Sequence, residues 1–117
     1  MKIPASQLKP GAQVKGVTIA DLGAGNQPLD MVPYSKDGHE YILIANSSRG
    51  LVKLQADGVA TAAAIDSPTK VDGPAGVPYD KLELKNVQQL AGMDSGHAVV
   101  LVGQRSAPLN LQTIALP

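Results

Sequence analysis

Two histidines stand at matching positions of the sequence, and an imidazole can ligate a metal or act as a general base. His39 and His97 each follow a glycine and precede an apolar run, 58 positions apart (39 to 97). A metal site would need further carboxylates or imidazoles that converge on them, and Asp37, Glu40 and Asp94 are close in sequence. Because turn residues commonly face solvent, the competing interpretation is two solvated turn histidines.

Two arginines are the other candidates for ligand binding. Arg49 and Arg105 flank two similar turns and would bind an anion if they met at one end of the molecule. The competing interpretation is a pair of solvated charges. We assign no catalytic residue. No serine has the Gly-x-Ser-x-Gly surroundings of a nucleophile elbow, and Asp57, Asp66, Asp72 and Asp80 stand in turns and loops, where aspartate is expected for backbone reasons.

A glycine-rich loop follows the first apolar segment. Thr18-Ile19-Ala20-Asp21-Leu22 leads into Gly23-Ala24-Gly25-Asn26, which resembles the S-adenosylmethionine loop of class I methyltransferases. That resemblance implies a helix after the loop, yet Pro28 and a strand-like run follow instead. A turn between antiparallel strands is the competing interpretation, and we expect no cofactor.

Composition excludes several classes of function. Ten basic and ten acidic residues cancel, so no strong field attracts nucleic acid or an anionic membrane. The chain has no cysteine, which excludes disulfides, thiolate catalysis and cysteine-ligated zinc. No stretch approaches the roughly 18 apolar residues of a membrane span. The first residues lack the apolar core of a signal peptide, so the compartment stays open between cytoplasm and, for a truncated piece, periplasm or exterior.

The elements that must position these residues are short strands. Nine prolines and twelve glycines interrupt the 117 residues, and the best helical window, Lys81 to Met93, alternates at period two before it becomes ambiguous. The pattern predicts strands bounded by tight turns, which together indicate an antiparallel all-β fold. They cover residues 13–22, 29–35, 41–45, 51–56, 59–65, 86–92, 98–102 and 109–116.

The two halves of the chain form a degenerate repeat. At an offset of 58 positions, the run Tyr41–Ala45 matches the run Val99–Gly103, and Leu51 matches Leu109. We predict a single β domain over residues 1–117, with repeat 1 at about 13–65, a linker at 66–78 and repeat 2 at about 79–117. A unit of about 40–60 residues with four strands is typical of a propeller blade, and chance similarity between apolar strands is the competing explanation.

Both repeated runs are apolar on both faces, so each must be covered on both sides. In a propeller every four-stranded sheet lies between neighbouring sheets. A strand at the corner of a barrel or sandwich is the alternative. Because two isolated sheets would leave apolar faces wet, the pattern predicts either self-assembly into a ring or a segment of a longer propeller.

The first repeat resembles the blades of bacterial propellers of the NHL and YVTN type. The residues that carry the resemblance are Gly25–Met31, Lys36–Asn46 and Gly50–Leu54, while residues 86–116 match weakly and the usual aromatic residues are missing. The resemblance implies antiparallel, propeller-blade-like four-stranded sheets, and these families are mostly scaffolds.

The sequence is compatible with three functional hypotheses. The leading hypothesis is a non-enzymatic scaffold that binds protein or a small ligand within a closed ring. Its partners would be further copies of the chain or the missing blades of a longer protein, with no nucleic acid and no membrane. The alternatives are an enzyme with polar residues in the central channel of the ring, and an S-adenosylmethionine-binding fragment that uses the Gly23-Ala24-Gly25 loop.

Overall fold

The computed structural model describes residues 1–66, 75–104 and 106–117, and this part of the chain is all-β with antiparallel sheets. Its one helical element is the 3₁₀ turn η1 (Ala5–Gln7), and no described helix is long and apolar enough to cross a membrane. The all-β expectation is therefore confirmed. Most of the predicted linker, residues 67–74, and Arg105 lie outside the described residues.

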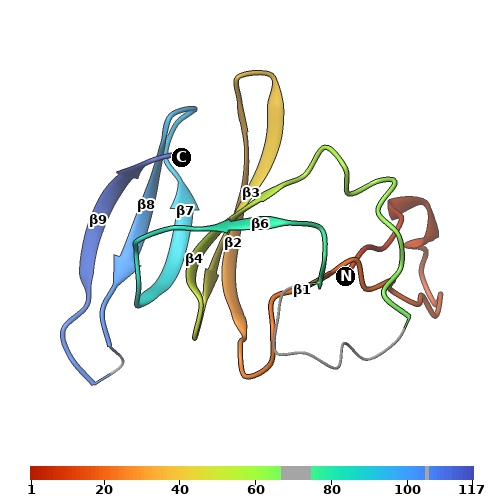
Figure 1. Cartoon of the computed structure of the whole chain (residues 1–117), viewed down its shortest axis with the longest axis horizontal. Coiled ribbons are helices and arrows are strands. Elements are labelled where there is room, and N and C mark those ends of the chain that lie inside the picture. Colours follow the sequence, from red (N-terminus) through yellow and green to blue (C-terminus); the bar gives the residue numbers. More distant parts are fainter. Residues whose placement is uncertain (67–74, 105) are drawn as a thin grey trace.

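The first sheet has four strands in the order β2-β3-β4-β6 (Figure 1). The strands are β2 (Pro28–Lys36), β3 (His39–Asn46), β4 (Gly50–Gln55) and β6 (Tyr79–Lys81). The turn between β2 and β3 contains Asp37 and Gly38 with φ angles of 52° and 79°. Two left-handed residues make the tight hairpin that matches the right-handed twist of the strands, as the Asp-Gly signal predicts.

The second sheet has three strands in the order β7-β8-β9. They are β7 (Val87–Gly92), β8 (His97–Val102) and β9 (Asn110–Ala115). A small third sheet pairs β1 (Ala20–Asp21) with β5 (Ala75–Gly76). Within the described residues, the expectation of two four-stranded sheets is therefore correct for the first sheet only. The window of residues 81–93, which had the best helical pattern, contains β7 and no helix.

Two predicted strands are absent or shortened. Residues 59–65 form turns and irregular chain, and the segment 13–22 contributes only β1 and a single bridge between Val17 and Lys2. A strand needs a neighbour whose backbone groups it can pair with. The free edge of β4 is taken by β6, which leaves residues 59–65 no place in the first sheet.

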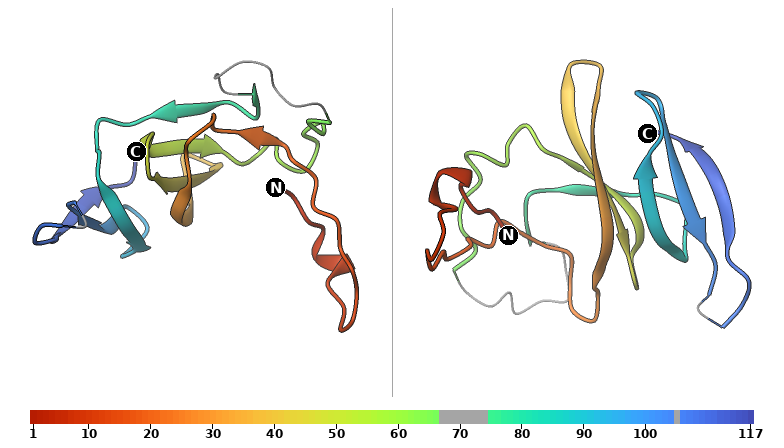
Figure 2. Two further views of the ribbon diagram at one scale, coloured as in Figure 1. Left: turned by 90° about the horizontal axis from the view of Figure 1, so that it is seen from below. Right: turned by 180° about the vertical axis from the view of Figure 1, so that it is seen from behind.

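The main core lies between the two larger sheets. Leu43, Leu51, Val87 and Val100 are almost completely buried there, and β2 and β7 are the strands that approach each other most closely across the gap. Figure 2 shows the two sheets side by side in two further views. The side chains between the sheets are what fixes their relative position.

A second cluster covers the far face of the first sheet. Ile44, Val52 and Leu54 are buried there beneath residues of the N-terminal segment and of the loops around Val59 and Val77. The strand β3 is therefore shielded on both faces by the chain itself. This outcome differs from the expectation that a chain of this length would be unable to cover it, because Ala20, Leu22, Val59 and Val77 pack on the far face.

Candidate functional site

His39 and His97 occupy corresponding places in the fold, each at the start of the second strand of its sheet. His39 Nδ1 lies 2.6 Å from Asp57 Oδ2, and His97 Nδ1 lies 2.9 Å from Asp94 Oδ1. Both pairs are exposed, and each histidine begins its strand just after a hairpin turn. The structure brings no third ligand to either histidine, and no group of metal-ligating side chains occurs among the described residues.

Asp57 closes the end of the β3–β4 hairpin. Its carboxylate accepts hydrogen bonds from Gln55 Nε2 at 3.0 Å, from the Glu40 N–H at 2.9 Å and from His39. These donors, above all the Gln55 amide, lower the pKa of Asp57 from its ordinary 3.8 to about 2. We call Asp57 with these three donors the Asp57 clamp, because its hydrogen bonds hold the end of β4 to the start of β3.

Asp94 plays a similar role in the second sheet, where it accepts hydrogen bonds beside the first residue of β8. It accepts the Gly96 N–H at 2.7 Å and contacts His97, and these two interactions lower its pKa. Donation to a carboxylate favours the charged form. The histidines that the repeat singles out therefore belong to two separate hairpin ends, where each one supports an acidic turn residue.

The glycine-rich loop and Arg49 come together, which the sequence did not predict. The Arg49 guanidinium lies against Gly23, where φ is +93° and a Cβ atom would collide with it. Asn26 Oδ1 accepts the Arg49 N–H at 3.1 Å, and its amide donates to Asn46 Oδ1 at 2.8 Å. Ser48 Oγ donates to the Gly25 carbonyl at 2.7 Å.

These contacts distinguish between a methyltransferase-like loop and a turn between strands. The loop is pinned to the turn between β3 and β4, and the strand β2 follows it where a methyltransferase-like loop would need a helix. The described structure therefore supports a structural turn at Gly23-Ala24-Gly25. Arg105, the other arginine candidate, lies outside the described residues.

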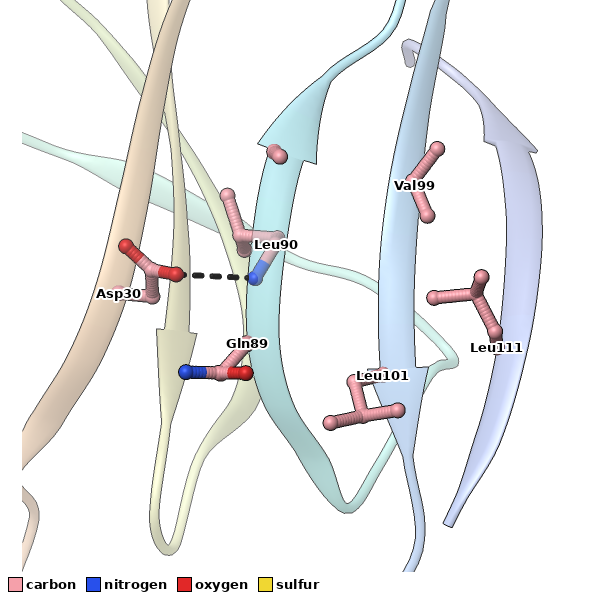
Figure 3. A pocket seen from close by; sticks show the side chains of 7 residues that line it. Asp30, Gln89, Leu90, Val99, Leu101 and Leu111 are labelled. Carbon is pink, nitrogen blue, oxygen red and sulfur yellow. Dashed lines mark hydrogen bonds between the residues drawn. The ribbon is translucent and has the colours of Figure 1, made fainter.

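A hollow of about 330 Å³ on the second sheet includes a group that sequence reasoning missed (Figure 3). Asp30 projects from β2 and its Oδ2 accepts the Leu90 N–H of β7 at 3.0 Å. The carboxylate thereby links the two sheets at their closest strands. An acidic residue within the otherwise apolar run of residues 28–33 was the available signal, although its partner is 60 residues away.

Beyond Asp30, this side of the second sheet carries apolar and uncharged polar side chains. We use the name outer face for the side of β7, β8 and β9 that points away from the first sheet. Val99 and Leu101 are half-buried there, and Leu111 is 73% exposed. Gln89 and Ala91 line the same hollow, and the register places Thr113 beside Val99 on this face (Figure 3). None of these side chains is charged.

A second hollow, of about 360 Å³, separates the N-terminal segment from the first sheet. Its wall includes Ile19, Leu22, Met31, Ile42 and Ile44. The walls are mostly apolar, and no titratable cluster converges on them, so the hollow offers shape and hydrophobicity but no evident chemistry.

Comparisons with protein-family models, with curated proteins and with solved structures find no match for this chain.

Proposed function

We propose that this protein is a non-enzymatic, propeller-type β scaffold whose outer face docks a further sheet in a closed ring. The further sheets come from other copies of the chain or from the missing blades of a longer protein. The single observation that carries the proposal is the direction in which the two sheets stack.

The pairing of strands fixes which residues correspond between the sheets. Ile42 pairs with Leu54 in the first sheet, and Val100 pairs with Gln112 in the second. Both residues of the second pair lie 58 positions after those of the first, so β3 corresponds to β8 and β4 to β9. Leu43 then corresponds to Leu101.

Corresponding residues point the same way in both sheets. Leu43 is fully buried against the second sheet, while Leu101 faces away from the first. Ile42 belongs to the far face of the first sheet, whereas Val100 is buried in the core between the sheets. A two-fold axis between the sheets would bring equivalent faces into contact. Here the contact is between non-equivalent faces. The second sheet is therefore related to the first by a single stacking step. Repeating that step would place a further sheet on the outer face.

A ring of copies needs the outer face of one copy to dock on the far face of the first sheet of the next copy. That far face is covered only in part, because Val52 is fully buried by the chain's own segments while Met31 is 55% exposed and a hollow of about 360 Å³ opens beside Ile42. Leu101 and Leu111 remain accessible on the outer face. A closed propeller needs at least about four sheets, and this chain supplies two larger ones.

The test is the solution mass of the protein by sedimentation equilibrium, with an outer-face variant. We expect an assembly of at least two chains, and we expect Leu101→Lys to reduce its mass because a docked charge without a partner is costly to desolvate. Gln13→Lys, which adds the same charge at an exposed site elsewhere, is the control.

A mass of one chain would contradict assembly from copies and leave only the blades of a longer protein as the source. A structure of an assembly in which Leu101 and Leu111 stay open to water would contradict both sources.

A further inference from the structure

The strand β9 is an open edge of the second sheet. It pairs with β8 on one side, and no described strand pairs with it on the other. In the first sheet the corresponding strand β4 is covered by β6. Unpaired N–H and C=O groups along a strand are a template for another strand.

The other edges of the two larger sheets are protected. The edge strand β2 contains Pro33 and lies against β7. The edge of β7 is capped where Asp30 accepts the Leu90 N–H. The strand β6 is three residues long and carries Asp80 and Lys81. Each of these devices discourages pairing with another chain.

By contrast, β9 has none of these devices. Its six residues, Asn110–Ala115, include no charge and no proline, and the next described residues on both sides are also uncharged. The strand keeps regular register with β8 along its whole length. Its edge is therefore regular, uncharged and able to pair.

The pairing with β8 decides which backbone groups point outward. The Leu116 N–H donates to the Gly96 carbonyl at 2.8 Å. In an antiparallel ladder the groups alternate, so even-numbered residues of this segment face β8. The N–H and C=O groups of Leu109, Leu111, Thr113 and Ala115 therefore face outward. The first sheet has the same arrangement, because Leu51, which corresponds to Leu109, pairs outward with Leu84 and Leu82.

We infer that β9 pairs with β9 of a second copy across a two-fold axis at Gln112, which joins the two second sheets into one. In this register Leu111 lies opposite Thr113 of the partner, and Leu109 lies opposite Ala115. All four outward-facing residues then find backbone partners, whereas an axis at Leu111 or Thr113 would leave some of them unpaired.

A second copy suits this edge better than a charged or irregular segment. The antiparallel pairing of an uncharged strand with itself brings no like charges together, which would be unfavourable directly across a strand pair. Both copies keep the same face on the same side, so the outer faces continue from one copy to the next. An interface of one strand pair is smaller than the standard size, and we therefore expect a reversible, concentration-dependent dimer.

Single-cysteine cross-linking tests the register, because the chain has no cysteine of its own. In the proposed dimer the two Gln112 residues form a non-hydrogen-bonded pair with Cα atoms about 4.5 Å apart, which a disulfide can span. We expect Gln112→Cys to give a covalent dimer under a glutathione redox buffer.

Asn110→Cys is the matched control, on the same strand and the same face. In the proposed register Asn110 lies opposite Ile114, so its counterpart is displaced by about 14 Å along the strand. We expect Gln112→Cys to cross-link at least about tenfold faster than Asn110→Cys, since only the former has a high effective concentration. Equal rates, or faster cross-linking of Asn110→Cys, would overturn the inference.

A second variant removes an outward-facing donor without touching the β8 pairing. Thr113→Pro deletes one edge N–H, and proline is tolerated at such edge positions, whereas Thr113→Val keeps the N–H. When Thr113→Pro is added to Gln112→Cys, we expect the cross-linking rate to fall at least about tenfold, while Thr113→Val leaves it unchanged. Circular dichroism checks that both variants remain folded, and an unchanged rate in folded Thr113→Pro would contradict the pairing.

This edge is distinct from the outer face. Leu101→Lys disrupts stacking of a sheet on the outer face but leaves the β9 backbone groups in place. Loss of assembly in Leu101→Lys with retained cross-linking at Gln112→Cys therefore separates the two proposals, and the failure of one does not imply the failure of the other.

Discussion

At the scale of single residues, the polar groups of this protein mostly hold turns and join strands. Asp57 and Asp94 each gather donors at a hairpin end, and Asp30 accepts a backbone N–H across the gap between sheets. Tyr34 is buried, and its hydroxyl donates to the Pro117 carbonyl at 2.8 Å. Burial raises the pKa of Tyr34 to about 12, and repulsion from Tyr41 is the smaller cause.

The Asp57 clamp gives a prediction about pH. Because its folded pKa of about 2 lies below the ordinary 3.8, the carboxylate contributes stability above about pH 4 and loses it as the pH falls toward 2. Carbon NMR of the Asp57 carboxyl should give a midpoint near pH 2, and Gln55→Ala should raise it because the Gln55 amide is the main donor. Gln13→Ala is the control, and a midpoint unaffected by Gln55→Ala would contradict this account.

At the scale of elements, the positions of turns were predictable and the choice of neighbours was not. Asp37-Gly38 and the glycine at position 50 mark real turns. The apolar runs at Tyr41–Ala45 and Val99–Val102 lie in β3 and β8. The run at residues 59–65 had similar apolar character, yet β6 is the strand that pairs with β4. When β6 pairs there, Leu82 and Leu84, which follow it, pack against the main core.

Gly50 tests how closely the chain after β6 approaches β4. Its φ is +72°, and a Cβ atom would lie 2.9 Å from the Leu84 carbonyl oxygen. Gly50→Ala should lower the free energy of unfolding by about 1–3 kcal/mol, because it combines left-handed strain with a backbone clash. Gly58→Ala, at a site with open space and no positive φ, should change it by less than about 0.5 kcal/mol. Urea denaturation measures both, and equal effects would contradict the close approach.

At the scale of the whole molecule, the two larger sheets stack by a repeated step, so corresponding residues have different environments. Leu43 is 0% exposed, while Leu101 is only half-buried at the equivalent site. The difference arises because one sheet has a neighbour on that side and the other has none within the described chain. This asymmetry is what the proposed ring would remove.

The same pair of leucines yields a stability prediction. In dilute solution Leu43→Ala should cost about 2–5 kcal/mol of unfolding free energy, as large-to-small changes in cores do. Leu101→Ala should cost clearly less there, because its side chain already meets water. As the concentration rises and sheets dock, the cost of Leu101→Ala should approach that of Leu43→Ala. Equal costs in dilute solution would contradict the exposure of the outer face.

The candidate site was foreseeable in part. Glycine and histidine positions at an offset of 58 residues pointed to equivalent hairpin ends, and both histidines lie there. Their partners were less accessible, since Asp57 is 18 residues from His39 and the Asp30–Leu90 bond spans 60 residues. Local patterns carry no information on which distant backbone group an aspartate will meet.

The amino-acid sequence by itself determined the strand-and-turn character of the chain, because period-two apolar patterns, prolines and Asp-Gly turns act over a few neighbouring residues. Only the tertiary structure decided that β6 completes the first sheet, that the segment around β1 packs on part of its far face, and that Leu101 and the edge of β9 stay open. Those choices depend on competition between distant segments for the same apolar surface and backbone groups, and that competition is settled by packing in three dimensions.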